Sequence, residues 1–384
     1  MQLYCDQERL AAALKAVLPA VPSRPLAVTD AGILLSSADG HLEVTATDRE
    51  IAIRCRVGAQ VAKPGHVVLP ARTITDLVAL LEAGERVAVE LDEGTDTLTL
   101  QCARTQAHVR GWNADDFPPL PEPAGEPVAR VEAETLRDGI GRVIYAAGAD
   151  ASRPALCGVL MHFDGAQVTL ATADGFRLAE YTLPLAEPVA EPLDLVIPAR
   201  GMRELSKFGE EGEVSITLDK GRHHAIFEAG DVVIAGQLAG KFPDYRQIIP
   251  QEWNVRVVAE RVSLLQACRA AKAMHGERDI LCIEVVPPDT LVVSASSALA
   301  GEGQTRVKAA ALETRGLRDG LPIRVALNVR YFDEAVKATD GDLVSISTTA
   351  YEAEECCLVV RPVVVQPAGG DADGLWVIMP IQLS

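Results

Sequence analysis

At residues 68–72 the chain reads Val-Leu-Pro-Ala-Arg, and at residues 196–200 it reads Val-Ile-Pro-Ala-Arg. These stretches lie 128 residues apart, and a weaker third copy, Ala-Leu-Asn-Val-Arg, stands at residues 326–330. Each copy precedes a pattern that predicts a helix, at residues 73–82, 201–208 and 331–339. Each helix precedes an alternation that predicts a strand, at residues 86–91, 213–218 and 342–347. The chain therefore contains one supersecondary unit three times.

A second set of repeats lies upstream of the first. Amphipathic helices are predicted to open at Glu8, Glu134 and Glu260, and to end near Pro19, Ala147 and Met274. The triplets Asp-Phe-Pro at 116–118 and Lys-Phe-Pro at 241–243 lie 125 residues apart. A period near 126 residues indicates three tandem copies of one α+β domain, with two helices on one side of a largely antiparallel sheet. Proline-rich stretches place the boundaries, which gives domains over residues 1–125, 126–252 and 253–384.

The composition bounds the class of protein. Hydrophobic residues make up 48% of the 384 residues, which is enough to form cores, whereas aromatic residues make up only 4%. The formal net charge of −18, taken alone, disfavours a nucleic-acid-binding protein, because DNA affinity normally comes from clustered Lys and Arg. Net charge does not report distribution, however, so a basic inner face on an acidic body stays compatible with it.

The cysteines and the N-terminal stretch indicate a compartment. The eight cysteines are scattered through apolar runs without a C-x-x-C pair, so a zinc site or a disulfide framework is not expected: Cys5, Cys55, Cys102, Cys157, Cys268, Cys282, Cys356 and Cys357. The first residues contain no basic and apolar leader, and no apolar run reaches the length of a membrane span. We therefore expect a cytoplasmic protein with reduced thiols, no metal and no cofactor.

Several local motifs, in order and correctly spaced over the whole chain, carry a resemblance. They are Ala-Asp-Gly-Phe-Arg-Leu-Ala at 173–179, Phe-Pro-Asp-Tyr-Arg at 242–246, Val-Ile-Met-Pro-Ile at 377–381, Arg-Pro at 24–25 and Ser-Arg-Pro-Ala-Leu-Cys-Gly at 152–158. With the threefold repeat, the sequence resembles the beta subunit of bacterial DNA polymerase III, the beta sliding clamp family.

The resemblance implies a function without catalysis. Family members form a head-to-tail homodimer, a ring of six DNA-clamp domains that encircles duplex DNA without reading its sequence. The ring confers processivity by tethering partners: the DNA polymerase III alpha subunit, the clamp loader, and other polymerases and repair proteins with motifs similar to Gln-Leu-x-Leu-Phe. Because the hold on DNA is topological, a modest positive lining suffices, which removes the objection from the net charge.

The family docks these peptide motifs in an apolar pocket. Carried over by motif, the pocket residues are Leu156, Ala173, Gly175, Phe176, Arg177, Leu178, Pro243, Ile248, Val377, Met379, Pro380, Ile381 and Gln382. Leu, Ile, Val and Met make an adaptable socket, and we expect Arg177 to meet the polar end of the peptide. The alternative for the apolar members is that they are core. Ala173 and Gln382 stand where the family usually has Thr and Arg, and Ser384 follows the usual terminal Leu (here Leu383), so ligand preference could differ.

The resemblance and the recurrent basic residues on the repeated helices also predict a DNA-facing set. It comprises Arg24, Arg72, Arg142, Arg153, Arg200, Arg203, Lys207 and Arg330. Asp150 stands where some relatives carry a polar DNA contact, and an acid there puts that contact in doubt. The match also suggests a dimer seam of four residues: Ala107 and Val109 against Ala273 and Met274.

An enzyme is not expected. The sequence lacks a P-loop, an H-E-x-x-H motif and a G-x-S-x-G motif, and its seven histidines, among them the pair His223-His224, have no recurrent ligand spacing. Asp48 and Asp174 occupy equivalent repeat positions, which favours turn capping over acid–base work. Two further readings stay open: a specialised paralogous clamp whose altered pocket tolerates a clamp-binding inhibitor, and a peptide-binding adaptor that does not encircle DNA.

Overall fold

The computed structural model describes residues 1–208, 212–274, 279–297, 301–316, 323–352, 358–369 and 373–382. His275, Cys356, Cys357, Leu383 and Ser384, which entered the sequence analysis, lie outside these residues. The chain divides into two compact units, each described by itself below. Unit 1 contains Met1–Arg137, Leu185–Ala190 and Ile197–Ala239, and unit 2 contains Asp138–Pro184, Glu191–Val196 and Gly240–Ser384. The boundaries of the three sequence repeats stay a prediction.

Six α-helices lie at the predicted places in the described chain. They are α1 (Gln7–Val17), α2 (Ala71–Ala79), α3 (Ala133–Val143), α4 (Ala199–Leu205), α5 (Arg261–Ala273) and α6 (Val329–Ala338). The helices after the opening pentapeptides begin two residues earlier than predicted, because Pro70 and Pro198 occupy the N-cap positions and helix starts at the next residue. At the third repeat the Asn328 side chain caps α6 by accepting from the N–H groups of Arg330 and Tyr331.

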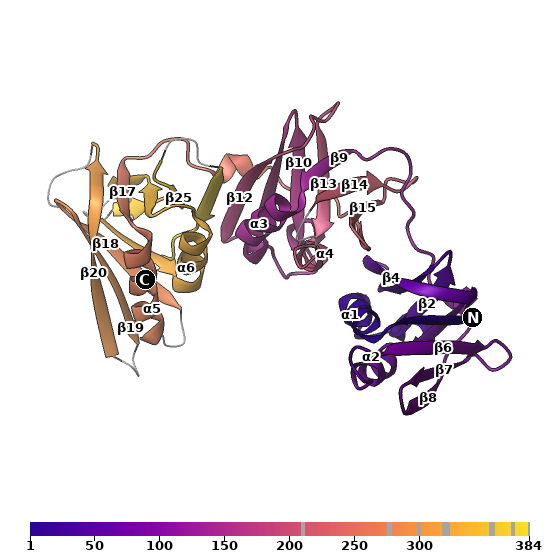
Figure 1. Cartoon of the computed structure of the whole chain (residues 1–384). Helices are drawn as coiled ribbons and strands as arrows, with labels where there is room; N and C mark the ends of the chain where they lie inside the picture. The colour runs from indigo at the N-terminus through magenta and orange to yellow at the C-terminus, as the bar shows by residue number, and fades with distance from the viewer. Residues whose placement is uncertain are drawn as a thin grey trace. The chain divides into compact units, whose positions relative to one another are not determined.

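Unit 1 is built on one antiparallel sheet path that runs β8-β7-β6-β1-β4-β16-β15-β14-β9, with β2, β3 and β5 off this path. The strands are β1 (Gln2–Asp6), β2 (Gly32–Ala38), β3 (His41–Thr47), β4 (Ile51–Lys63), β5 (Gly65–Pro70), β6 (Arg86–Asp92), β7 (Thr97–Cys102), β8 (Thr105–Arg110), β9 (Ala129–Glu132), β14 (Glu213–Leu218), β15 (His224–Ala229) and β16 (Val232–Gln237). The helices α1 and α2 pack together (Figure 1). His223 and His224 lie in the hairpin between β14 and β15, where the Asp219 side chain accepts from both backbone N–H groups.

Unit 2 has a second antiparallel path, β13-β10-β11-β12-β26-β25-β22-β17-β20-β19-β18-β21, and a separate pair, β23-β24. The strands are β10 (Gly158–Asp164), β11 (Gln167–Ala173), β12 (Arg177–Pro184), β13 (Leu193–Pro198), β17 (Val255–Glu260), β18 (Ile280–Val286), β19 (Thr290–Ser297), β20 (Gly301–Thr314), β21 (Ile323–Asn328), β22 (Leu343–Thr348), β23 (Ala350–Glu352), β24 (Leu358–Val360), β25 (Val363–Pro367) and β26 (Gly374–Ile378). The helices α5 and α6 pack together (Figure 1).

Aliphatic side chains form the cores, as the low aromatic content predicts. Strands alternate buried and exposed residues, so one face of each sheet is apolar. The largest fully buried side chains include Trp376, Phe163, Phe227 and Phe332. Antiparallel sheets with helices packed on them confirm the α+β fold class. No helix of the described residues is long and apolar enough to cross a membrane.

Candidate functional site

Three large apolar side chains of the predicted pocket are exposed on unit 2. Phe176 is 62% exposed, Ile248 47% and Met379 40%. Exposed apolar side chains of this size carry an unfavourable hydration free energy of about 25 cal/mol per Å². We call these three residues the apolar patch. Large exposed apolar side chains that gather at one place mark sites of protein binding more often than chance exposure does.

A tight turn presents Phe176. The Asp174 carboxylate accepts hydrogen bonds from the backbone N–H groups of Phe176 (2.8 Å) and Arg177 (3.0 Å). Gly175, between Asp174 and Phe176, has a φ of +94°, a backbone conformation that residues with a Cβ rarely adopt. At the equivalent turn of unit 1, Asp48 accepts from Glu50 (3.1 Å) and Ile51 (2.9 Å) in the same way. The prediction that these two aspartates cap turns is confirmed.

The C-terminal strand places Met379 beside Phe176. Strand β26 pairs antiparallel with β12, with Arg177 opposite Ile378 and Tyr181 opposite Gly374. The N–H of Met379 then donates to the Phe176 carbonyl (2.8 Å). Two residues on, the N–H of Ile381 donates to the Ala326 carbonyl (2.8 Å), so the segment is fixed at both ends. Pro380 and Ile381 are half-buried, and Gln382 is exposed.

Two short 3-10 helices, η5 (Pro154–Cys157) and η6 (Tyr245–Ile248), carry further residues of the predicted pocket. Tyr245 anchors η6, since its ring meets Phe242 edge-on with centroids 6.0 Å apart and its hydroxyl donates to Glu180 on β12. Burial, and then the Glu180 carboxylate, raise the pKa of Tyr245, so the phenol stays a donor. Ile248 ends η6, Pro243 before it is exposed, and Leu156 on η5 is half-buried.

The remaining predicted pocket residues lie deeper than expected. Ala173 (7% exposed), Leu178 (1%) and Val377 (1%) belong to the core. Strand alternation explains this, because Leu178 and Val377 are paired neighbours whose side chains face inward. For these three residues the structure supports the core alternative, and only a bound group that reaches between the exposed side chains would touch them.

Arg177 differs from the expectation. Its side chain is 5% exposed, and Nε donates to Asp174 (2.9 Å) while Nη2 donates to the Tyr145 carbonyl (2.5 Å). Nη1 forms an ion pair with Glu334 on α6, 157 residues away in sequence. The guanidinium also lies over the ring of Tyr331, 4.1 Å from its centroid. Each of its three side-chain nitrogen atoms therefore has a partner within the chain, and the side chain ties β12 to α6.

Three partners of Arg177 were not predicted. Tyr145, Tyr331 and Glu334 appear in no motif, and only the four-residue spacing of Arg330 and Glu334 on one helix predicts a contact. That contact is present, with Arg330 Nε 3.3 Å from Glu334 Oε1. The longer-range partner of Glu334 has no sequence signal, because it depends on how β12 is placed against α6.

The predicted DNA-facing residues occupy helices and loops, and several already have acidic partners. Arg200 is paired with Asp48 and Glu50, Lys207 with Glu204, and Arg153 with Asp150. Asp150 stands where some relatives carry a polar DNA contact, and here its carboxylate also offsets the charge of Arg153. Of the other five residues, Arg24, Arg72 and Arg203 are exposed, Arg330 is paired with Glu334, and Arg142 is half-buried.

Arg142 requires a correction. Its Nη1 donates to the Ala338 carbonyl (2.7 Å), its Nη2 lies 2.6 Å from an Asp340 carboxylate oxygen, and its guanidinium stacks on the Tyr181 ring at 4.8 Å. A cation at the C-terminus of α6 satisfies the last carbonyl groups and the negative end of the helix dipole. The residue is therefore a structural cap, and the structure does not leave its charge open to a phosphate.

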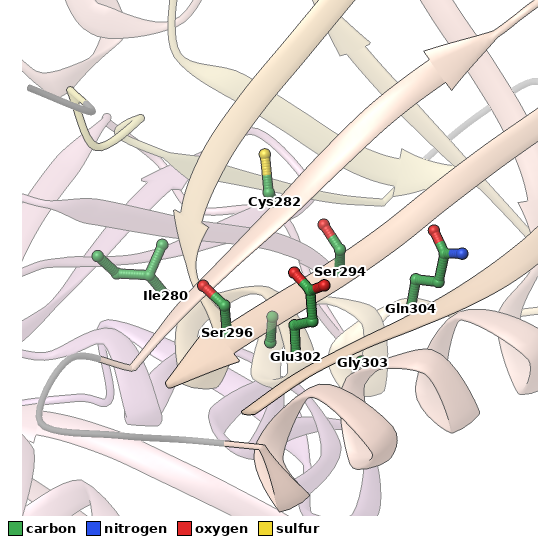
Figure 2. Close-up of a pocket in the computed structure, with 8 residues that line it drawn as sticks. Ile280, Cys282, Ser294, Ser296, Glu302, Gly303 and Gln304 are labelled. Atoms are coloured by element: carbon green, nitrogen blue, oxygen red, sulfur yellow. The ribbon is translucent and has the colours of Figure 1, made fainter. Parts of the chain in front are cut away.

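A hollow of about 650 Å³ lies at one edge of unit 2, away from the apolar patch. Figure 2 shows side chains from three adjacent strands around it: Ile280 and Cys282 from β18, Ser294 and Ser296 from β19, and Glu302 and Gln304 from β20. Gly303 also lines it, and Met274 lies so close that a Cβ on Gly303 would be 3.1 Å from Met274 Cγ. Of the predicted seam, Ala273 is exposed, Met274 and Ala107 are half-buried, and Val109 is buried in its own sheet.

Among the described residues, no group of three or more His, Cys, Asp or Glu is arranged to hold a metal ion. Burial raises the pKa of the Cys5, Cys55 and Cys268 thiols to about 12, and a neighbouring carboxylate adds to the effect in each case. These thiols are thus protonated at neutral pH and are poor nucleophiles.

Known proteins resemble this chain over its whole length. Two family models match, "DNA polymerase III beta subunit, N-terminal domain" over residues 1–121 and "DNA polymerase III beta subunit, central domain" over residues 130–244. The beta sliding clamp of Synechococcus elongatus is 30% identical over 393 residues, with 100% of both chains covered. That of Streptomyces coelicolor is 26% identical over 391 residues, again with 100% of both covered. In fold, the DNA polymerase sliding clamp from Bacillus subtilis matches with a TM-score of 0.90 at 22% identity over 100% of both chains.

Proposed function

This chain belongs to the DNA polymerase III beta subunit family and is a DNA sliding clamp, a non-catalytic processivity factor, and we propose that two copies of it close head to tail around duplex DNA. The observation that supports the ring is that a strand of one repeat pairs with a strand of the repeat before it, so that two repeats form one sheet. It predicts both the contact between two copies and its polarity.

Two junctions inside the chain follow one rule. In unit 1, β16 adds antiparallel to β4, with Gly236 opposite Ile51 and Val232 opposite Cys55. In unit 2, β26 adds antiparallel to β12, with Ile378 opposite Arg177 and Gly374 opposite Tyr181. Each time the last strand of one sequence repeat extends the fourth strand of the repeat before it. The backbone of Gln237 also donates to Glu50 as that of Met379 donates to Phe176, both at 2.8 Å.

By the same rule, one strand of the first repeat and one strand of the third repeat each keep an edge without a partner strand in the described residues. Strand β8, the last of the first repeat, ends its sheet path and pairs with β7 alone. The first half of β20, residues 301–308, pairs with β19 on one side, while its second half pairs with β17. Unpaired edges attract another strand. Adding β8 of one copy to β20 of another repeats the internal junction, and doing so twice closes a ring with a heterologous interface.

The hollow in Figure 2 lies over one face of β18, β19 and β20, and its Glu302 and Gln304 belong to the half of β20 that pairs with β19. Both β8 and residues 301–308 of β20 are extended backbone, so their pairing satisfies N–H and C=O groups of both copies. Small residues suit this contact: Ala107 is on β8, and Gly303 is on β20 under Met274. Ala273 and Met274 then border the partner strand, as the family resemblance suggests, while Val109 supports β8 from behind.

Placing a carboxylate on each side of this seam is expected to separate the copies. The double variant Ala107→Glu, Met274→Glu brings two like charges together at a desolvated edge, which costs several kcal/mol. Sedimentation at micromolar concentration should give about 82 kDa for the native protein, twice the chain mass of 40.9 kDa, and the single-chain mass for the variant. Tyr4→Glu, at an exposed strand residue outside the edge, is the control and should stay dimeric. A native protein of single-chain mass would refute the ring.

Within the ring we propose that duplex DNA meets the exposed cations among the predicted set, foremost Arg24 and Arg72. Pairing of Arg153, Arg200, Lys207 and Arg330 with carboxylates supports loose contact, because fewer protein cations then neutralise phosphates and release counterions, so the salt dependence is shallow. Such contact suits sliding, and base readout is unnecessary. The protein would act in the cytoplasm, where bacterial DNA is replicated.

We propose further that the apolar patch docks the Gln-Leu-x-Leu-Phe-like segments of partners, including the DNA polymerase III alpha subunit and the clamp loader. Phe176, Ile248 and Met379 supply exposed apolar surface on three separately anchored segments. Leu156, Gly175, Pro243, Pro380, Ile381 and Gln382 complete the rim, with Ala173, Leu178 and Val377 beneath it and Arg177 tying β12 to α6. No observation favours an adaptor that fails to encircle DNA, or a respecialised paralogue.

A further inference from the structure

Unit 1 contains a cavity of about 340 Å³ that belongs to neither the apolar patch nor the open edge. Its lining comes from α1, from the middle of β4, from the start of β16 and from Phe208: Arg9, Ala12, Ala13, Ala16, Cys55, Arg56, Val57, Gly58, Phe208, Asp231 and Val232. This volume is at the lower end of the range for small-molecule sites, about 300–1,000 Å³. Three of the helix residues that face it are alanines.

The equivalent place in unit 2 is filled. Residue 10 of α3 is Arg142, and its guanidinium lies over Tyr181 on β12 at 4.8 Å. Behind them, a Cβ on Gly374 would meet Trp376 at 2.5 Å and Tyr181 at 2.8 Å, so the region has no free volume. Two planar groups, stacked face to face, therefore occupy this position between helix and shared strand.

The register assigns the counterparts in unit 1 without ambiguity. Residue 10 of α1 is Ala16. The strand residue opposite the first paired residue of the incoming strand is Tyr181 in unit 2 and Cys55 in unit 1. An arginine and a tyrosine are thus replaced by an alanine and a cysteine, and both small side chains line the cavity.

The charges at the rim select the sign of an occupant. The Arg9 Nη1 atom lies over β4, 3.9 Å from the position of a Cβ on Gly58. Arg56 is paired with Glu43 at 3.1 Å and is about half exposed. Arg56 alternates with the buried Cys55 and Val57 along β4, so its guanidinium lies on the other face of the sheet with Glu43. Arg9 is therefore the cation that faces the cavity, and Asp231 is the carboxylate in its lining. The floor of Ala13, Cys55 and Val57 is buried and carries no charge, because burial and the Asp231 charge keep the Cys55 thiol protonated.

We propose that this cavity is a binding site for a small aromatic anion, whose ring lies between α1 and β4 and whose acidic group meets Arg9. The ring replaces the Arg142–Tyr181 stack of unit 2, and burying it against Ala13, Ala16 and Val57 recovers apolar contact that the alanines forgo. The acidic group gains charge-assisted hydrogen bonds from guanidinium donors. The site is independent of ring closure and of the peptide-docking proposal.

The test uses anilinonaphthalene sulfonate, an aromatic anion that fluoresces in apolar surroundings, titrated into the full-length protein. Ala16→Phe fills the cavity, and Ala16 is only half-buried, so the variant should fold. We expect its binding to be at least tenfold weaker than that of the native protein. Arg9→Gln should weaken binding several-fold, while naphthalene without the sulfonate should bind the native protein and this variant alike.

The Phe176→Ala, Met379→Ala variant separates this signal from the apolar patch. The proposal holds if that variant binds the probe as the native protein does and Ala16→Phe does not. It is overturned if Ala16→Phe binds the probe unchanged, or if the patch variant alone loses it. Should Ala16→Phe fail to fold, Ala16→Leu, which occupies the same space with a smaller side chain and adds no charge, replaces it with the same expected loss.

Discussion

Replacing Arg177 with alanine is expected to lower the free energy of unfolding of unit 2 by about 3–5 kcal/mol, the usual loss when one member of a buried ion pair is removed. The side chain is 5% exposed, and its partners Asp174 and Glu334 are 15% and 25% exposed. Without the guanidinium two carboxylates face each other with little water, and the Tyr145 carbonyl loses a donor. Hydrogen exchange of the β12 and β26 amides, together with urea unfolding, would measure the effect.

Arg330 offers a matched control for Arg177. It pairs with the same Glu334 but is 64% exposed, so Arg330→Ala should cost about 0.3–0.5 kcal/mol, as exposed helix pairs do. If both variants lost the same stability, burial of the Arg177 cluster would not matter and the account of that cluster would be wrong. Where Arg177→Ala does not fold, Arg177→Lys keeps the charge but not the forked geometry and should fall between the two.

Removing the apolar patch is expected to abolish most of the affinity for partner peptides. Phe176→Ala and Met379→Ala each delete an exposed apolar side chain, and anchors of this kind contribute about 2 kcal/mol or more when truncated. Because about 1.4 kcal/mol corresponds to a tenfold change, each variant should weaken binding at least tenfold and the pair at least a hundredfold. The measurement is fluorescence anisotropy of a labelled peptide with a Gln-Leu-x-Leu-Phe-type motif.

A control for this experiment is available on unit 1. Leu80 is 83% exposed, so Leu80→Ala removes as much apolar surface without touching the patch, and its peptide affinity should match that of the native protein. Both pocket variants alter exposed side chains, so stability should change little. Peptide binding within twofold of the native value in the double variant would show that the patch is not the docking site.

The fold could be predicted because its signals are local. The pentapeptides at 68–72 and 196–200 fix a strand, a proline cap and a helix within a few residues, and the period repeats that information across the chain. The helix boundaries differ from the prediction by a turn or less. At Asp48 and Asp174 even the hydrogen bonds follow from residue type, since aspartate side chains accept from backbone N–H groups two and three residues ahead.

The candidate site could be predicted only in part, for reasons that particular residues make clear. Phe176, Ile248 and Met379 are exposed as a docking surface requires, whereas Leu178 and Val377 are buried because strand register turns them inward. Arg142 and Arg177 were expected at surfaces and instead bind carbonyl and carboxylate groups of α6 and its flanking residues. Pattern within a repeat does not encode such contacts, because they arise where two repeats meet.

Retention on closed and on cut DNA tests the central claim most directly. The protein would be loaded onto a nicked circular plasmid with a clamp loader and ATP, and protein that stays with the DNA would be measured by gel filtration at physiological salt, before and after a single-site restriction enzyme cuts the circle. A ring held by topology should stay on the circle and fall to background on the linear DNA, where it slides off the ends. Equal retention on both forms would mean that the protein holds DNA by affinity, and would contradict the account.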